Sequence, residues 1–440
     1  MLNAIADLIQ RTADALFMPW LLLLLFGTGI FLTIRYRFVQ VRRFGEAFRS
    51  MLSAQEGTVG ALSPFQAFMT ALSGTIGTGN IAGVATAIVS GGPGALFWIW
   101  AYGFVATTIK FTEAVLGVTW RETSGQTIKS GPMYALRDGL GKPWLASAYA
   151  IVAGVAALTT TPFTQPNSIA VVLESELGMP TWAAGVGIAV LVWLVIVGGI
   201  GSIGRAAEKL APLKVGLYLG GGLIVIGLFA DRIPAVLSLV FNEAFSLRAG
   251  AGGTLGFVIA MRYGLARGMY ANEAGYGTAS VAYGTARSRH PEQQGLQAVM
   301  EVVIVSFVTS TISAMTILLT GAWQSGLTST AAVASAFDAA LPGVGGYIVA
   351  LCAFLFGYTT LIGWAFYGEQ FFEYLLGRPV ARWYGWVYCL LIPLGAIGRV
   401  EVVWAWGDLM NALQIFPNII GVIGLSGFAA KVARGRAAAP

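Results

Sequence analysis

The sequence predicts an all-α polytopic membrane protein with eleven transmembrane helices. These form a five-plus-five inverted repeat with two broken helices, preceded by one extra amino-terminal helix. Three observations support this fold class. The 440 residues are 56% hydrophobic and only 10% charged, with a mean hydropathy of +0.74, whereas soluble domains carry about 25% charged residues. Two membrane-length segments are interrupted by glycines, and the basic residues gather in alternate loops.

Eleven apolar segments are predicted as membrane spans, for which a helix needs about 20 residues on average. They span roughly 17–36, 64–90, 94–120, 146–174, 181–200, 211–230, 255–284, 297–322, 345–373, 383–398 and 402–428. Residues 1–16 predict a short amphipathic helix at the membrane interface. The chain then divides into an amino-terminal region (residues 1–62), a first repeat (63–230), an external loop (231–254), a second repeat (255–430) and a tail (431–440).

The loops on the two sides of the membrane differ in charge. With eleven spans, one side receives 19 of the 26 Lys and Arg residues, and the other receives Arg11, Arg232, Arg248 and Arg399. Because cytoplasmic loops carry the excess of positive charge, we expect a plasma (inner) membrane protein with its amino terminus outside and its carboxyl terminus in the cytoplasm. The 19 residues are Arg35, Arg37, Arg42, Arg43, Arg49, Arg121, Lys129, Arg137, Lys142, Arg205, Lys209, Lys214, Arg287, Arg289, Arg378, Arg382, Lys431, Arg434 and Arg436.

The first interrupted segment contains ALSGTIGTGNIAGVA, residues 71–85. Four glycines lie there among Ser, Thr and Asn, and each glycine inside a helix costs about 1 kcal/mol relative to alanine. A helix that breaks at mid-membrane frees backbone groups, which a bound ion or polar solute can satisfy. The alternative is close packing of two helices through small residues.

The second interrupted segment contains GLARGMYANEAGYGTAS, residues 264–280, with four more glycines around Asn272 and Glu273. Interrupted segments in corresponding positions of two halves point to the binding site of a transporter. The first segment runs from inside to outside, and the second, five spans later, runs the other way. The two halves are therefore predicted to be inverted copies, with a site near the midplane where the breaks face each other.

Two further spans carry polar side chains at mid-membrane depth. Gln165 and Asn167 in span four lie beside prolines that loosen the helix. In span nine, the adjacent hydroxyls of Thr359 and Thr360 are neutral oxygens that suit a weakly hydrated monovalent cation, unless they bond back to their own helix. Trp364 follows one turn later, where it could wall a small pocket or pack passively.

Charged residues inside the spans are costly and usually functional. Lys110 and Glu113, three residues apart on one helix, are predicted to form an internal ion pair. Arg267 and Glu273 flank the second break, where they could pair with each other or hold the loosened backbone. The remaining membrane carboxylates, interpreted as structural or gating partners, are Glu301, Glu369 and Asp408.

The sequence excludes several classes of function. It contains no nucleotide-binding motif, no nucleophile triad and no metal-binding constellation. We therefore expect no catalytic residues, no organic cofactor and no nucleic-acid partner, with an ion gradient as the source of energy.

Eight stretches together resemble the alanine or glycine:cation symporter family, the sodium:alanine symporters. They are SGTIGTGNIAGVA (73–85), GGPGALFWIW (91–100), SGPMYAL (130–136), SIGRAAEKLAP (202–212), ARGMYANEAGYGTA (266–279), HPEQQG (290–295), IGWAFYGE (362–369) and GDLMNALQIFPNII (407–420). The resemblance covers spans two to eleven and implies a leucine-transporter-like fold. It also implies a symporter for small neutral amino acids, alanine or glycine, with Na⁺ as the coupling ion.

The resemblance also implies residue roles. Thr75 and Gly79 would bind the substrate carboxylate, because backbone amides and a half-helix N-terminus favour an anion. Gln165 and Trp364 would shape the side-chain pocket, and Gly264 and Gly268 would take the substrate ammonium through freed carbonyls. The implied sodium ligands are Ser73, Ile76, Thr359 and Thr360.

One departure from the family pattern concerns the coupling ion. In span eight the family tends to carry an Asp-Thr pair, where this chain has Val305 and Ser306. Glu301, one turn earlier, is the proposed substitute. Two alternatives to a sodium symporter follow, a proton-coupled carrier of small amino acids and a membrane protein or channel that binds an amino acid without coupled transport.

Overall fold

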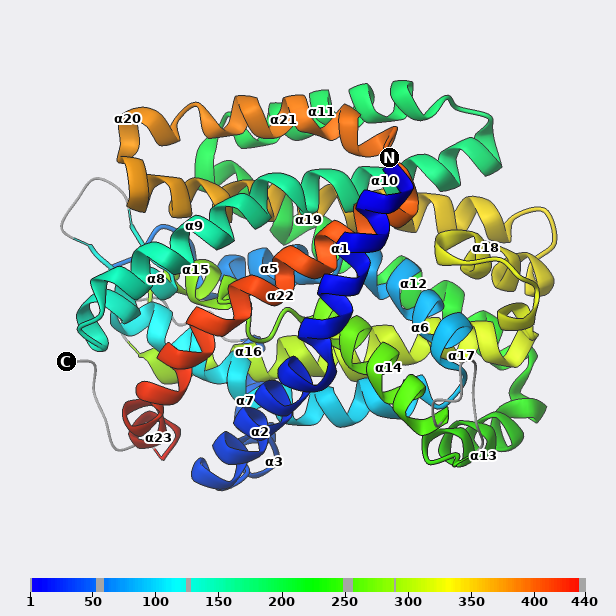
Figure 1. Cartoon of the computed structure of the whole chain (residues 1–440), viewed down its shortest axis with the longest axis horizontal. Coiled ribbons are helices and arrows are strands. Elements are labelled where there is room, and N and C mark those ends of the chain that lie inside the picture. The colour runs from blue at the N-terminus through cyan, green and yellow to red at the C-terminus, as the bar shows by residue number, and fades with distance from the viewer. Residues whose placement is uncertain (1, 53–58, 124–127, 248–255, 289, 435–440) are drawn as a thin grey trace.

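The computed structural model describes residues 2–52, 59–123, 128–247, 256–288 and 290–434, and the described residues are predominantly helical (Figure 1). Among the residues on which the charge count relied, Arg248, Arg289 and Arg436 lie outside the described ranges, as do portions of the predicted external loop and tail. Five described helices are long and apolar enough to cross a membrane, or seven if each of two bent pairs counts as one span. The eleven-span topology stays a prediction.

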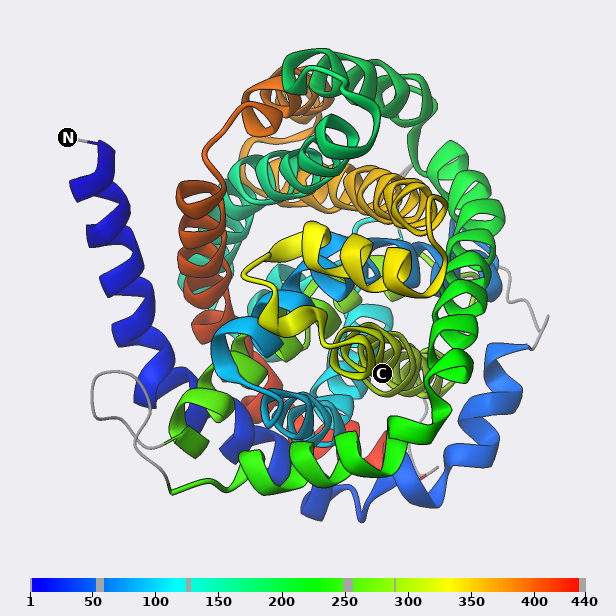
Figure 2. The same ribbon diagram turned by 90° about the vertical axis from the view of Figure 1, so that its right-hand side faces the viewer.

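The amino-terminal region forms one nearly continuous helix. The predicted interfacial helix is α1 (Leu2–Leu16), which passes through a π-helical turn, η1 (Phe17–Leu21), into α2 (Leu22–Arg35). The start of α1 points away from the rest of the molecule (Figure 2). The short helices α3 (Val39–Arg42) and α4 (Phe44–Met51) follow in the predicted cytoplasmic loop.

The first interrupted segment breaks as predicted. Its first half, α5 (Pro64–Thr75), starts at a capping box in which the side chains and backbone amides of Ser63 and Gln66 bond reciprocally. A short 3₁₀ turn, η2 (Thr78–Asn80), separates it from α6 (Ala82–Gly91), and the two halves are bent by 61°. The backbone leaves the helix at Ile76 and is extended at Gly77.

Spans three and four fold close to their predicted bounds. Span three is α7 (Ala95–Thr119). After α8 (Pro132–Tyr134) and the π turn η3 (Ala135–Gly139), span four consists of α9 (Pro143–Thr159) and α10 (Thr161–Leu177). They join at Thr160, next to Pro162 in the first turn of α10, because a proline has no backbone N–H to continue the preceding helix.

The loop predicted between spans five and six is largely helical in the structure. Span five is α11 (Thr181–Ile196), and α12 (Gly199–Leu228) begins about three turns earlier than expected. Arg205, Lys209 and Lys214 therefore lie on a helix, and Lys214 is fully buried instead of facing the cytoplasm. Part of the predicted external loop is also helical, as η4 (Ala230–Arg232) and α13 (Ile233–Ala244).

The second interrupted segment also breaks, but later than the first glycines suggested. Helix α14 (Gly256–Asn272) runs through Gly264 and Gly268, and α15 (Thr278–Gly284) follows. Between them Glu273, Gly275 and Gly277 have positive φ values of 54°, 99° and 85°. Two of these positions are glycines, which adopt this backbone region without steric cost.

The remaining spans follow in the predicted order. Span eight comprises α16 (Pro291–Val302), the π-helical η6 (Val303–Thr309) and α17 (Ser310–Thr320), and the short η7 (Ala322–Gln324) and α18 (Ser329–Ala340) were not predicted. Span nine is α19 (Gly345–Leu376), and α20 (Arg378–Ala381) leads into span ten, α21 (Tyr384–Ala396). Span eleven, α22 (Val400–Gly424), turns by 61° into α23 (Ser426–Ala433).

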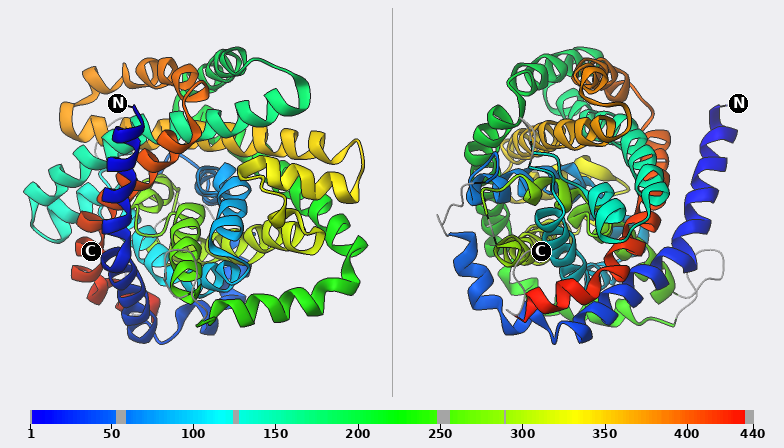
Figure 3. Two further views of the ribbon diagram at one scale, coloured as in Figure 1. Left: turned by 45° about the vertical axis from the view of Figure 1, so that its right-hand side comes forward. Right: turned by 90° about the vertical axis from the view of Figure 1, so that its left-hand side faces the viewer.

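The two interrupted helices lie in the interior of the molecule. Helix α14 packs against α6 and α7, and α5 packs against α12 and α19. In Figure 3 the blue α6 and the green α14 lie side by side in the middle of the bundle. The outer helices present large exposed apolar side chains, among them Leu191, Leu194, Leu217 and Leu390, as expected for contact with lipid.

Candidate functional site

A small buried cavity lies between the two breaks. Five of the predicted site residues line it, namely Thr75, Gly79, Gln165, Thr360 and Trp364. Six residues that were not predicted for the site line the cavity as well, namely Thr160, Thr161, Tyr270, Glu273, Tyr276 and Asn411. The cavity volume is about 10 Å³, which is roughly the space that one water molecule needs. The site is therefore closed in this conformation.

The backbone of the first break approaches its neighbours closely. A Cβ atom at Gly77 would lie 2.8 Å from Thr360 Oγ1 and 2.9 Å from Gln165 Oε1, and one at Gly79 would lie 2.6 Å from the Tyr270 ring. The Gln165 side chain accepts hydrogen bonds from the backbone N–H of Thr78 at 3.0 Å and from its hydroxyl at 2.9 Å. The glycines thus bring bare backbone to the cavity, and Gln165 anchors the turn.

The second break contributes a carboxylate. Glu273 accepts a hydrogen bond from Trp364 Nε1 at 2.8 Å and one from the Thr278 hydroxyl at 2.7 Å. It lines the cavity from the α14–α15 turn, together with the glycines of the first break. The sequence signal that could have placed Glu273 in the site is its position between two predicted half-helices.

An ion pair lies one turn before the cavity along α14. Arg267 donates two hydrogen bonds to the Asp408 carboxylate, at 2.8 and 3.1 Å, and its guanidinium stacks over Trp404. The suggested pairing of Arg267 with Glu273 is therefore wrong, because Arg267 points across to α22. One turn later, the Tyr270 hydroxyl donates to Thr164 at 2.8 Å and closes the same wall.

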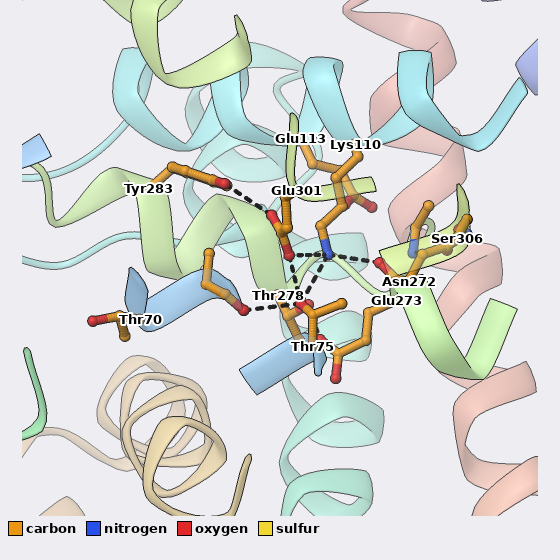
Figure 4. Close-up of polar contacts among 12 residues, drawn as sticks. Thr70, Thr75, Lys110, Glu113, Asn272, Glu273, Thr278, Tyr283, Glu301 and Ser306 are labelled. Atoms are coloured by element: carbon orange, nitrogen blue, oxygen red, sulfur yellow. Dashed lines mark hydrogen bonds and ion pairs between the residues drawn. The ribbon is translucent and has the colours of Figure 1, made fainter. Parts of the chain in front are cut away.

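A second ion pair ties the breaks to span eight. The Lys110 ammonium lies 3.1 Å from Glu301 and donates to the backbone carbonyl of Asn272 at 2.8 Å (Figure 4). Glu301 also accepts hydrogen bonds from the hydroxyls of Thr75 and Tyr283, at 2.5 and 2.9 Å. Both members of the pair are buried.

Glu113 does not form the predicted ion pair with Lys110 but bonds to the second break. Its carboxylate accepts hydrogen bonds from the backbone N–H groups of Gly275 and Gly277, at 3.0 and 3.1 Å, and from the Asn418 amide at 2.6 Å. A carboxylate at the start of α15 satisfies the free amides of a half-helix. The prediction failed because helical spacing alone cannot reveal a better partner on another segment.

The predicted sodium ligands lie together, with a lysine among them. Lys214 Nζ donates hydrogen bonds to Ile76 O at 2.5 Å, to Thr359 Oγ1 at 2.6 Å and to Ser73 O at 3.2 Å. Thr360 Oγ1 donates to Ser73 O at 3.0 Å. Lys214 was not predicted for the site, because it lies near the start of span six and was counted with the charges of the cytoplasmic side.

Gly264 and Gly268 lie away from the cavity. Both are inside α14, where a Cβ atom at Gly264 would meet Ala95 O at 2.6 Å and one at Gly268 would meet Tyr102 Cδ1 at 3.3 Å. They allow α14 to approach α7 closely, as small residues do between membrane helices. The structure therefore does not bring them to the site predicted for the substrate ammonium.

Other singled-out residues hold the framework. Asn167 donates to the carbonyls of Gly395 and Gly398, at 3.3 and 2.7 Å. Ser306, at the departure from the family pattern, accepts a hydrogen bond from Asn272 Nδ2 at 3.1 Å. Its helix segment η6 is π-helical, a geometry frequent at functional sites.

The described part of the chain is helical, with an apolar exterior and a closed polar cavity between two interrupted helices, which is the architecture of a multi-pass membrane transporter. A family model described as "Sodium:alanine symporter family" matches residues 2–436, and the chain belongs to this family of amino-acid:cation symporters.

Curated relatives cover nearly the whole chain. It is 37% identical over 421 residues to the sodium/alanine symporter AgcS of Methanococcus maripaludis, covering 93% of this chain and 92% of that protein. It is 32% identical over 436 residues to the putative sodium/proton-dependent alanine carrier protein YrbD of Bacillus subtilis, covering 95% of this chain and 90% of that protein.

Solved transporters share the fold. A manganese transporter of Eremococcus coleocola aligns with a TM-score of 0.59 at 17% identity, covering 83% of this chain and 80% of that one. MhsT in complex with L-phenylalanine aligns with a TM-score of 0.52 at 15% identity, covering 85% of this chain and 100% of that one. These similarities establish a leucine-transporter-like fold.

Proposed function

We propose that this chain is a secondary symporter that imports small neutral amino acids, alanine and glycine, by alternating access. One observation carries the proposal. Groups that favour a negative charge and groups that favour a positive charge line the same cavity. Gly77 and Gly79, which bring bare backbone, and Glu273, which brings a carboxylate, line the same small cavity. A free amino acid is a zwitterion whose two charges match these two kinds of group.

The carboxylate of the substrate would bind at the first break. The half-helix α6 begins just after Gly79, and a helix N-terminus attracts an anion through its free N–H groups and dipole. Thr75 and Gly79 line the cavity at this point. Gln165 holds the turn through Thr78, which keeps these groups in place.

The ammonium of the substrate would bind at the second break. We assign this role to Glu273 in place of the carbonyls of Gly264 and Gly268, which lie inside α14. A carboxylate oxygen accepts about two hydrogen bonds, so each Glu273 oxygen has capacity beyond its contact with Trp364 or Thr278. The charge-assisted contact would be stronger than one to a neutral carbonyl.

The walls of the cavity favour a small side chain. Trp364, Tyr270 and Tyr276 surround it, and bulky aromatic side chains leave little room beside the bound backbone groups. Alanine and glycine are therefore the proposed substrates.

The two ion pairs are the proposed gates. Arg267, which pairs with Asp408 of α22, lies before the second break along the chain, and Glu301 bonds Tyr283 beyond it. With the amino terminus outside, as the charge distribution predicts, the first pair lies on the external side and the second on the cytoplasmic side. Alternating access would open one while the other stays closed.

The coupling cation has two candidates. Sodium is the ion that the family description names, with Ser73, Ile76, Thr359 and Thr360 as its proposed ligands. Lys214 donates hydrogen bonds to three of these four residues, which favours the second candidate, a proton-coupled carrier. A non-transporting binding protein would show neither dependence.

Uptake of labelled alanine into proteoliposomes tests the proposal. An inward sodium gradient, an inward proton gradient and no gradient are compared, with and without a protonophore. Accumulation above equilibrium with either ion supports symport and identifies the ion. Equilibration without accumulation would contradict coupled transport, and no saturable uptake of alanine or glycine would contradict the substrate assignment.

The orientation has a separate test in cells. A protease tag before Met1 should be cleaved from outside, and one after Pro440 should be protected. The opposite pattern, or protection of both, would contradict the predicted plasma membrane topology.

A further inference from the structure

The buried ammonium of Lys214 lies at the carboxyl end of the first half-helix. Lys214 is on α12 and fully buried, and its Nζ reaches the carbonyls of Ser73 and Ile76 and the hydroxyl of Thr359. These acceptors come from α5, from the break that follows it and from α19. The lysine therefore joins three segments at the edge of the candidate substrate site.

The hydrogen bonds of this lysine are complete. An ammonium has three N–H donors, and three oxygen acceptors lie within 3.2 Å of Nζ. The Phe356 ring adds a cation–π contact, with Nζ 5.4 Å from the ring centroid. All three acceptors are uncharged oxygens, the kind of ligand that a sodium ion would take.

The location favours a cation for a physical reason. The last carbonyls of a helix lack intrahelical partners and carry the negative end of the helix dipole. At the first break, the Gly77 N–H bonds to Thr75 O at 3.0 Å instead of to Ser73 O. Ser73 O is thereby free to accept from Lys214 and Thr360.

A sodium ion and this ammonium cannot share these atoms. The same carbonyl and hydroxyl oxygens would have to bind both, and two positive charges at contact distance repel each other. The residues present therefore do not fit sodium at this position while Lys214 points into it.

We propose that the Lys214 ammonium is the built-in cation of this site and takes the place of a sodium ion. It holds the first break in shape and supplies positive charge next to the proposed carboxylate position. Substrate binding then does not require sodium. This inference rests on the proposed function, because the neighbouring cavity, which Thr360 also lines, is where the substrate would bind.

The first experiment measures alanine binding to the purified full-length protein in detergent, with sodium present or replaced by choline. Coupling between an ion and a ligand typically changes affinity about 5- to 150-fold, and we expect less than about twofold for the wild type. A sodium-dependent affinity would overturn the inference and leave the proposed function intact. Absence of alanine and glycine binding in both media would overturn both.

The second experiment exchanges the built-in cation for a free one. Lys214→Ala leaves Ser73 O, Ile76 O and the two threonine hydroxyls around an open space. The Ser73 hydroxyl is buried and has no hydrogen-bond partner among the described residues. We expect alanine binding to become sodium-dependent by at least about fivefold. Lys214→Met, which fills the space without a charge, should weaken binding with no rescue by sodium.

The matched control is Lys209→Ala, a change of an exposed lysine on the same helix, which should bind alanine as the wild type does. Thermal unfolding without substrate gives a second readout, because a ligand of the folded state raises the melting temperature. Sodium, compared with choline, should stabilise Lys214→Ala and leave the wild type unchanged. Stabilisation of the wild type by sodium to the same extent as Lys214→Ala would overturn the inference.

Discussion

The indole Nε1 of Trp364 lies 2.8 Å from a carboxylate oxygen of Glu273 and donates a hydrogen bond to it. One residue belongs to the long helix α19 and the other to the break between α14 and α15. Both line the cavity. A hydrogen bond therefore links Trp364, which is proposed to limit substrate size, to Glu273, which is proposed to bind the substrate ammonium. Substitutions of the two side chains have distinct expected effects.

Trp364→Ala should enlarge the cavity. We expect alanine affinity to fall by about tenfold, which corresponds to about 1.4 kcal/mol, and larger neutral amino acids to become substrates. Competition of labelled alanine uptake by a series of neutral amino acids of increasing size measures both effects. Trp364→Phe keeps the bulk and should keep the preference for small substrates. An unchanged profile in Trp364→Ala would remove this residue from the site.

Glu273→Gln should weaken recognition of the substrate ammonium. Hydrogen bonds to charged groups contribute about 1.5–3 kcal/mol, so we expect roughly a tenfold to hundredfold loss of alanine affinity. Isothermal titration of the purified variant measures it. Asp231→Asn, an exposed carboxylate on η4, serves as the control and should bind normally. Wild-type affinity in Glu273→Gln would show that the ammonium binds elsewhere.

Glu301→Gln should lower stability, because it leaves Lys110 as an unpaired buried charge. Removing one partner of a buried ion pair costs about 3–5 kcal/mol. The melting temperature in detergent should fall clearly, whereas Glu122→Gln, which disturbs a partly exposed pair with Arg137, should change it little. The double variant Lys110→Met with Glu301→Gln should recover part of the loss. Equal melting temperatures for Glu301→Gln and Glu122→Gln would contradict the buried charge pair.

Asp408→Asn should weaken the Arg267 gate and favour a conformation open on that side. A reporter cysteine at Thr161, introduced after removal of Cys352 and Cys389, lines the cavity. We expect a membrane-impermeant thiol reagent added outside to label it several times faster in Asp408→Asn. Glu401→Gln, at an exposed site on the same helix, should label at the background rate. Labelling that is faster only from inside would reverse the proposed sides of the two gates.

Much of the candidate site was predictable from residues 71–85 and 356–369. Gly77, Gly79 and the polar side chains between them mark a helix break through backbone preferences, which are local properties of the chain. Thr75, Gly79, Gln165, Thr360 and Trp364 then followed from the family resemblance, and all five line the cavity. The bounds of span three were also predictable from the local sequence, since a continuous apolar run defines them.

The partners of the buried charges were beyond the reach of the sequence. Local spacing suggested Lys110 with Glu113 and Arg267 with Glu273, but the pairs that form are Lys110 with Glu301 and Arg267 with Asp408. Both join helices far apart in the chain, so their distances depend on how the helices pack. Lys214, near the start of the predicted span six, was counted with the cytoplasmic charges for a related reason, because only the packing of α12 against other helices shows that this residue is buried.

The sequence by itself determined that this chain is a helical membrane transporter with two interrupted helices, because composition and glycine placement act locally. Only the tertiary structure decided which cation faces the carbonyls of Ser73 and Ile76. That choice depends on α12 lying against α5 at the level where Lys214 can reach the break. An ammonium and a sodium ion satisfy the same oxygens, and three-dimensional packing alone determines which of them is there.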